Sequence, residues 1–183
     1  MDNPFQYPGL RVLKLFFDEP YRNFYLREIA KLVDVSPSRA KGFLDFYENR
    51  GLLLKSGRAN LVLFKANMEN PSFRSMKVGL FLLKAEPLIA FLREKYADSS
   101  IVLYGSCARG EDDSESDVDL LAVGRRTDHV DVSAYEKQLG GRITLLVYAS
   151  RQWEEKAKED KAFYERILVD GVVLHGSLPV VKG

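Results

Sequence analysis

The sequence predicts a mixed α+β or α/β protein made of two modules. The first would hold three helices followed by a β-hairpin, and the second β-strands separated by helices. Three observations carry this prediction. Apolar residues recur at helical spacing three times before residue 50, two short apolar runs then flank a polar turn, and three β-rich runs at helix-length intervals fill the second half. With 183 residues, the chain has the length of one domain or two small ones.

Composition argues against membrane-spanning and disulfide-rich classes. Hydrophobic residues make up 46% and charged residues 29% of the chain, as in an average ordered, water-soluble protein. The longest apolar runs, such as residues 79–83, are far shorter than the roughly 20 residues of a membrane span. The first residues lack a signal-peptide pattern, and the single cysteine, Cys107, allows no intrachain disulfide. We therefore expect a cytoplasmic protein with no membrane association.

The net charge of +1 hides an asymmetry along the chain. Residues 1–77 carry 13 Lys and Arg against 8 Asp and Glu, whereas residues 78–183 carry 14 against 18. A basic first part and an acidic second part indicate two modules with different partners, an anion for the first and cations for the second.

Three helices are expected in the first module. Dense apolar residues predict a buried helix over residues 10–17, and helical spacing predicts a second over 26–33. Ser36 is a good N-cap and Pro37 suits the first helical position, so these two residues begin the third helix. Gly51 can end it in a left-handed conformation. The residues of this helix expected to face the core are Ala40, Phe43, Leu44, Phe46 and Tyr47.

A β-hairpin should follow the third helix. Two apolar runs, residues 52–55 and 61–65, flank the polar turn 56–60. Three helices and a hairpin in this order resemble the winged helix-turn-helix family, with a domain over residues 1–68.

The winged-helix resemblance implies binding to double-stranded DNA. In that family, the start of the third helix faces the major groove and the hairpin, or wing, reaches a phosphate or the minor groove. The residues expected to contact DNA are Ser38, Arg39 and Lys41 in the helix and Arg58 in the wing. The alternative is a winged helix used for packing or for homodimerisation, with these side chains merely solvated.

A connecting helix over residues 69–86 should lead to the second module, residues 87–183. Pro87 either kinks one long helix or begins a second one. Three β-rich runs then predict strands over 101–104, 118–123 and 142–147.

The segment 103–123 holds the residue types of a phosphate and metal site. Gly105 and Ser106 follow a strand, where a glycine turn lets backbone amides approach an anion. Asp117 and Asp119 occupy alternate positions in the next strand, so both carboxylates should point to one side while their apolar neighbours face the core. Two aspartate oxygens suit a hard divalent cation, and we expect Mg²⁺ carrying nucleotide phosphates.

This segment resembles the signature of DNA-polymerase-β-type nucleotidyltransferases, in particular the minimal nucleotidyltransferases. The matching residues are Gly105-Ser106, then Ala108-Arg109-Gly110, then Ser116-Asp117-Val118-Asp119-Leu120. The resemblance covers about residues 87–176 and includes the closing segment FYERILVDGVVLHG. It implies that the second module has a mixed β-sheet flanked by helices.

The resemblance implies transfer of a nucleoside monophosphate from a nucleoside triphosphate to an acceptor hydroxyl or phosphate. Metal ions would align the α-phosphate with the attacking oxygen and neutralise developing charge. The residues implied to bind the nucleotide are Gly105, Ser106, Arg109 and Ser116, and those implied to bind Mg²⁺ and to be catalytic are Asp117 and Asp119. A solvated loop arginine is the alternative for Arg109.

One position departs from the family pattern. Active members usually carry a third carboxylate on the next strand, where this sequence has Thr144. A threonine hydroxyl is neutral and is no general base near pH 7, so catalysis should be weakened. Asp131 and Glu136 are the nearest acidic substitutes in sequence, but they lie in an expected loop and helix.

Two classes of function therefore stay open. One is an Mg²⁺-dependent nucleotidyltransferase with a DNA-binding winged helix. The other is a transcriptional regulator or an antitoxin whose weakened domain binds nucleotide or a partner. The resemblance implies a small HEPN-type toxin as such a partner, because minimal nucleotidyltransferases are often paired with one.

The remaining reactive residue types are interpreted as structural. His129 and His175 are separate surface or loop residues without a Ser or Cys partner at a known spacing. Cys107 has no adjacent base and is expected to be a small packed side chain. Trp153 is expected to belong to a helix core.

Overall fold

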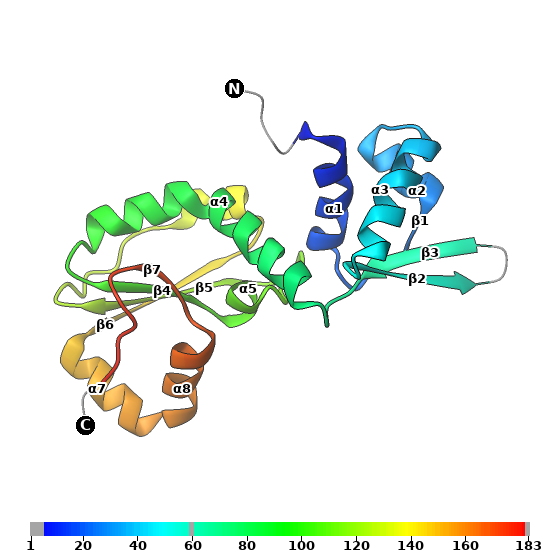
Figure 1. Ribbon diagram of the computed structural model, residues 1–183. Coiled ribbons are helices and arrows are strands. Elements are labelled where there is room, and N and C mark those ends of the chain that lie inside the picture. The colour runs from blue at the N-terminus through cyan, green and yellow to red at the C-terminus, as the bar shows by residue number, and fades with distance from the viewer. Residues whose placement is uncertain (1–5, 59–60, 182–183) are drawn as a thin grey trace. The chain divides into compact units, whose positions relative to one another are not determined.

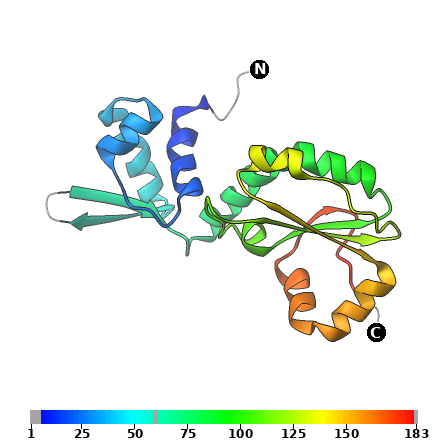
Figure 2. The ribbon, with the colours of Figure 1, turned by 180° about the vertical axis from the view of Figure 1, so that it is seen from behind.

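The computed structural model describes residues 6–58 and 61–181, with Arg58 described by its backbone alone. The chain divides into two compact units, Met1–Met76 and Lys77–Gly183. Figure 1 labels their elements, and Figure 2 shows the same ribbon from behind. Across the described ranges, no helix is both long and apolar enough to cross a membrane.

Three helices and a three-stranded sheet form the first unit. The helices are α1 (Pro8–Asp18), α2 (Leu26–Val33) and α3 (Pro37–Asn49), and the strands are β1 (Phe24–Tyr25), β2 (Leu53–Arg58) and β3 (Leu61–Ala66). The sheet order is β1-β3-β2, with antiparallel pairing throughout. The three helices and the hairpin are confirmed. The two-residue β1 was not predicted, because it is too short to show a period.

Local sequence sets the ends of α3. The Ser36 hydroxyl accepts a hydrogen bond from the Arg39 amide at 3.3 Å, and Pro37 occupies the first turn. Gly51 follows the helix with a φ of +68°, a conformation that favours glycine. Both predicted boundary signals are therefore confirmed.

Phe46 is the exception to the predicted core face of α3. Its side chain is 51% exposed, and the Arg50 guanidinium lies 5.1 Å from the centre of its ring. Ala40, Leu44 and Tyr47 are buried at the spacing of one helical face. Two residues along a helix turn the side chain by about 200°, so Phe46 points away from the face that holds Leu44. Counting Phe46 as core was wrong.

The helix α4 (Pro71–Lys95) is one continuous helix with Pro87 inside it. Its start is capped by Asn70, whose Oδ1 accepts hydrogen bonds from the amides of Ser72 and Phe73 at 2.8 and 3.2 Å. Pro87 therefore begins no second helix. The division between the two units falls inside α4, between residues 76 and 77, where the sequence analysis had placed a connecting helix over 69–86.

The second unit is a four-stranded sheet with helices on both faces. Its strands are β4 (Ser100–Tyr104), β5 (Val118–Gly124), β6 (Ile143–Ala149) and β7 (Val172–His175). Its helices, besides α4, are α5 (Gly105–Arg109), the 3-10 turn η2 (Ser133–Tyr135), α6 (Glu136–Leu139), α7 (Ser150–Glu159) and α8 (Lys161–Asp170). The sheet order is β6-β5-β4-β7, in which β5 and β6 are parallel and the other pairs antiparallel. The predicted mixed sheet flanked by helices is confirmed.

Strand alternation divides the core of this unit into two layers. Leu103 and Leu120 pack in the cluster that contains the buried residues of α4. Val102 and Leu121 pack on the opposite face with Trp153 of α7 and with α8. Figures 1 and 2 show α4 over one face of the sheet and α7 and α8 over the other.

Candidate functional site

Asp117 and Asp119 share the sheet face that α7 and α8 cover. Asp119 is the second residue of β5, and Asp117 lies directly before this strand rather than inside it as predicted. Asp117, Asp119 and Leu121 occupy every second position along the chain, and Leu121 packs on the side that α7 and α8 cover. Val118 and Leu120, the intervening residues, are buried on the α4 side. The two carboxylates thus come together on one side of the strand.

The bend after β4 lies against one of these carboxylates. Gly105 has a φ of +75°, in the left-handed region. A Cβ built on Gly105 would stand 2.4 Å from Oδ2 of Asp119, so a larger residue would force this carboxylate to move. The backbone conformation and the close approach both favour glycine, and the bend lies directly against the Asp119 carboxylate.

Burial and charge both act on Asp119. Its pKa is raised above the ordinary aspartate value, first because the carboxyl is partly desolvated and second because Asp117 adds a negative charge nearby. Tyr104, the pairing partner of Asp119 in β4, has a pKa raised to about 12 by burial and then by the charge of Asp119. The site therefore concentrates negative charge that a bound cation would relieve.

Thr144 stands beside Asp119 on the other side. The parallel register of β5 and β6 pairs Asp119 with Thr144, so a neutral hydroxyl stands at the strand position to which the resemblance assigns a third carboxylate. Among the residues that the structure describes, no group of three or more His, Cys, Asp or Glu side chains could hold a metal ion. Two carboxylates, not three, make up this site.

The two acidic substitutes considered from sequence each accept a hydrogen bond from a backbone amide. Asp131 accepts a hydrogen bond from the Ser133 amide at 2.9 Å. Glu136 accepts one from the Ile143 amide at 3.0 Å. Each carboxylate thus stabilises a local turn or strand start.

Arg109 and Ser116 are also tied to acidic neighbours. The Arg109 Nε donates to Glu111 at 2.7 Å, and one terminal nitrogen lies 3.7 Å from Asp170. The Ser116 hydroxyl donates to Asp113 Oδ1 at 2.9 Å. Ser106 lies half-buried in α5, next to Gly105. A phosphate would have to compete with carboxylates for Arg109.

Cys107 is packed and unreactive by its surroundings. It is 3% exposed, and burial, with added negative charge from Asp112, raises the pKa of its thiol to about 12. Its Sγ lies 3.5 Å from the carbonyl oxygen of Asp117, to which it donates. The structural interpretation of Cys107 is confirmed, as is that of Trp153, which is buried in the α7–α8 layer.

Sequence reasoning missed three polar residues of this region. Tyr104 lies beside Asp119, and the positive charge of Arg166 in α8 opposes the rise of the Tyr104 pKa. Lys77 of α4 is buried and pairs with Asp112 in the segment before β5. Only the tertiary fold brings Arg166 of α8 close to Tyr104, and Lys77 of α4 close to Asp112. Arg166 belongs to the closing segment FYERILVDGVVLHG described in the sequence.

The candidate DNA contacts lie at the start of α3. Ser38, Arg39 and Lys41 are exposed, as predicted for a groove-facing turn. Lys41 forms an ion pair with Asp45, and the Arg39 guanidinium lies 6.0 Å from the ring centre of Phe43. The Arg58 side chain lies outside the described residues.

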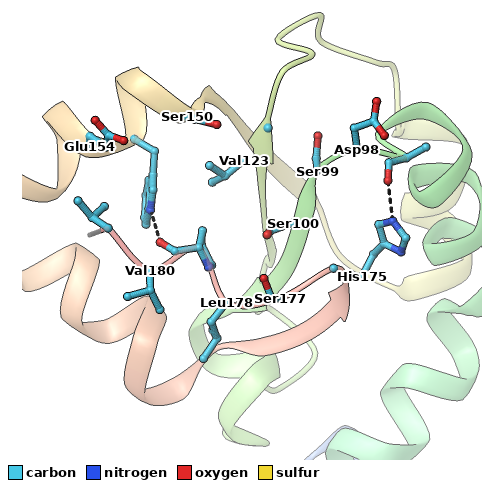
Figure 3. A pocket seen from close by; sticks show the side chains of 16 residues that line it. Asp98, Ser99, Ser100, Val123, Ser150, Glu154, His175, Ser177, Leu178 and Val180 are labelled. Carbon is cyan, nitrogen blue, oxygen red and sulfur yellow. Dashed lines mark hydrogen bonds between the residues drawn. The ribbon is translucent and has the colours of Figure 1, made fainter. Parts of the chain in front are cut away.

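A pocket of about 470 Å³ opens at the opposite end of β4 and β5 (Figure 3). Ser100 and Val123 line it, four residues away along the strands from Tyr104 and Asp119. Its other walls come from the start of α7 and from the chain after β7. It contains none of the predicted nucleotide-site residues.

Comparison with known proteins identifies one family and one related protein. The family model "Nucleotidyltransferase domain" matches residues 86–175. A protein of Methanocaldococcus jannaschii named "Putative protein adenylyltransferase MJ1379" is 33% identical over 82 residues, which cover 40% of this chain and 82% of that protein. The match therefore extends over most of the relative.

One solved structure shows a more distant likeness. It is titled "Possible transcriptional regulator from Methanosarcina mazei Go1", is 19% identical, and matches 48% of this chain and 77% of its own with a TM-score of 0.35. A superposition with so low a TM-score gives no information about function.

Proposed function

Because this chain belongs to the nucleotidyltransferase domain family, we propose that its Lys77–Gly183 unit transfers a nucleoside monophosphate from a nucleoside triphosphate to an acceptor, with Mg²⁺ held by Asp117 and Asp119. The observation that carries the proposal is the contact between the Gly105 bend and the Asp119 carboxylate. It joins a backbone turn suited to phosphate to an acidic pair suited to a cation.

The residues fit a magnesium ion. Aspartate oxygens are hard donors, and burial first and then the charge of Asp117 raise the pKa of Asp119. When bound, Mg²⁺ would neutralise charge on the reacting phosphates and orient them. Two features of the chain hold the Asp119 carboxylate beside the bend. Gly105 lets the backbone approach this carboxylate closely, and strand pairing places Asp119 between Tyr104 and Thr144.

Backbone amides, two hydroxyl groups and one arginine near the site would complete phosphate binding. Gly105 and Ser106 would offer backbone amides and a hydroxyl to the triphosphate, and Ser116 a second hydroxyl. Arg109 would have to exchange its partners Glu111 and Asp170 for a phosphate. A nucleotide that releases Arg109 from these carboxylates would thereby loosen the contact of α5 with α8.

Thr144 limits how the acceptor is activated. With a hydroxyl beside Asp119, no third carboxylate takes the proton of the attacking group. We therefore expect slow transfer to an acceptor hydroxyl. The relative named "Putative protein adenylyltransferase" supports an adenylyl group as the group transferred and a protein as the acceptor.

Labelling with ATP that is radioactive at its α-phosphate tests this proposal, because the transferred AMP keeps that phosphate while pyrophosphate leaves. With Mg²⁺ and a cell extract as the acceptor source, the wild-type chain should label an acceptor, and Asp117→Asn and Asp119→Asn should each abolish the label. Asp98→Asn is the matched control, because Asp98 is an exposed aspartate at the other end of the sheet. Unchanged labelling by both site variants would reject the proposal.

A second candidate function is DNA binding by the first unit. The order of three helices and a hairpin, with Ser38 and Arg39 exposed at the start of α3, favours it. Lys41 is paired with Asp45, so a DNA phosphate would have to replace this carboxylate. Binding to duplex DNA should weaken steeply as salt rises, whereas a salt-insensitive or absent interaction would indicate a docking module. A HEPN-type protein and a second copy of this chain would then be the partners to test.

A further inference from the structure

The segment Gly110–Asp117 joins the two halves of the proposed site. It begins next to α5, which carries Gly105 and Ser106, and ends at Asp117. None of its residues belongs to a helix or a strand. The position of the Asp117 carboxylate therefore depends on what holds this segment.

Hydrogen bonds close the second half of the segment into a compact turn. Asp113 Oδ1 accepts from the Glu115 amide at 3.1 Å and from the Ser116 hydroxyl at 2.9 Å. The Ser116 hydroxyl in turn accepts from the Asp113 amide at 3.0 Å. Residues 113–116 thus form one hydrogen-bonded turn, with Asp112 at one end and Asp117 at the other.

A buried lysine anchors this turn to α4. The Lys77 side chain is 4% exposed, and its ammonium donates both to the carboxylate and to the backbone carbonyl of Asp112. The other carboxylate oxygen, Oδ1 of Asp112, is buried and has no hydrogen-bond partner in the part of the chain described. A buried ion pair with an unsatisfied oxygen is a costly way to stabilise a fold, since apolar side chains of similar volume do so as well or better.

A second contact holds the far end. The Cys107 thiol donates to the carbonyl oxygen of Asp117, and the Val118 amide donates to the Arg142 carbonyl at 2.8 Å. Gly141 has no side chain to displace the Ser116 carbonyl, which a Cβ would approach to 2.5 Å. Asp117 is therefore fixed on the β6 side, and Lys77 fixes the side toward α4.

We propose that Lys77 is a positioning residue for the nucleotidyl-transfer site: its ion pair and hydrogen bond to Asp112 hold the Gly110–Asp117 segment so that Asp117 stands beside Asp119, and this sets the affinity for a divalent cation. The inference rests on the proposed function for its metal site. It assigns a role to a residue that lies 40 positions before Asp117 in the chain.

Binding of Mn²⁺ alone to the full chain tests the proposal. The electron paramagnetic resonance signal of the free ion measures how much Mn²⁺ is bound. Lys77→Met should weaken Mn²⁺ binding about tenfold, as removal of a residue that orients a metal ligand commonly does. Lys84→Met is the matched control. Lys84 lies on the same helix and donates to the Leu139 carbonyl at 2.8 Å, away from the segment, and its loss should leave Mn²⁺ binding unchanged.

A double variant separates positioning from folding. Lys77→Met leaves Asp112 as a lone buried charge and can unfold the chain, whereas Lys77→Met with Asp112→Leu removes both charges and should restore the melting temperature. Because neither new side chain can donate to the backbone at residue 112, Mn²⁺ binding should stay about tenfold weaker and amide exchange over 110–117 faster. A double variant that folds and binds Mn²⁺ like the wild type would overturn the proposal.

Asp117→Asn tells the two levels of inference apart. If Asp117→Asn loses Mn²⁺ binding while the folded Lys77 variants keep it, the role of Lys77 is refuted and the metal site stands. If Asp117→Asn itself binds Mn²⁺ like the wild type, the metal site of the proposed function fails, and the positioning role fails with it.

Discussion

At the scale of single residues, we expect Thr144 to limit the chemistry that the acidic pair can support. It is the β6 partner of Asp119, so its side chain has the place from which a carboxylate could take a proton. A hydroxyl there adds no negative charge and accepts no proton near pH 7. The expected activity is therefore present but slow.

Thr144→Asp should raise the initial rate of acceptor labelling with ATP by roughly tenfold or more, because it supplies a general base and a third oxygen donor. Thr144→Asn controls for size, since it brings a carbonyl oxygen without a charge. A Thr144→Asp rate equal to that of the wild type would show that the missing carboxylate is not what limits transfer.

The raised pKa of Asp119 predicts that the stability of the fold depends on pH. Burial and the charge of Asp117 raise its pKa in the folded chain above the value in the unfolded chain. The folded state then holds its proton more tightly, so stability falls as pH rises from the ordinary aspartate range through the raised pKa, and the full penalty applies above it. Without divalent cations, Asp119→Asn should therefore melt at a higher temperature than the wild type at pH 7.

This gain should disappear below about pH 3, where the carboxyl is protonated in both states. Melting curves at several pH values, recorded in a chelator, measure it. A variant less stable than the wild type at pH 7 would show that the Asp119 carboxylate makes a stabilising contact that outweighs its burial.

At the scale of elements, α4 shows how packing overrides a local signal. Pro87 has no amide hydrogen for the helix, yet α4 continues through it because Ala85, Leu88 and Leu92 are buried against the sheet. The proline itself is exposed, so its ring displaces no core residue. Position in the tertiary structure, rather than helix propensity, maintains this turn.

Pro87→Ala should accordingly raise the free energy of unfolding, by about 1–2 kcal/mol. The alanine restores the amide for a hydrogen bond to Leu83, while the loss of proline's stiffness in the unfolded chain takes back part of the gain. Urea unfolding followed by circular dichroism measures the change. Destabilisation would indicate that the geometry of α4 depends on the proline ring.

The other elements divide by the strength of their local signals. The Ser36–Pro37 start of α3, the Gly51 end and the hairpin strands were predictable because capping and turn chemistry act within a few residues. The two-residue strand β1 was not, because its pairing of Phe24 with Phe64 joins residues 40 positions apart. Phe46 was misplaced because dense apolar residues obscure which face of a helix is buried.

At the scale of the whole molecule, the two compact units predict separable activities. Arg39→Ala should weaken binding to duplex DNA, since each neutralised phosphate contributes to affinity, and should leave acceptor labelling unchanged. Asp117→Asn should do the reverse. Gel-shift and labelling assays on the same two preparations check this. Loss of both activities in either variant would show that the units act together.

The sequence by itself determined the three helices and the hairpin of the first unit and the acidic pair behind a glycine bend, because periodicity, capping and strand alternation are local properties of the chain. The mixed sheet was predicted through the family resemblance. The resemblance also placed Thr144 where the structure pairs it with Asp119. Only the tertiary structure decided that Gly105 touches the Asp119 carboxylate and that Lys77 holds Asp112. It also set Arg109 between Glu111 and Asp170. Such contacts depend on how helices settle on a sheet, which no local pattern encodes.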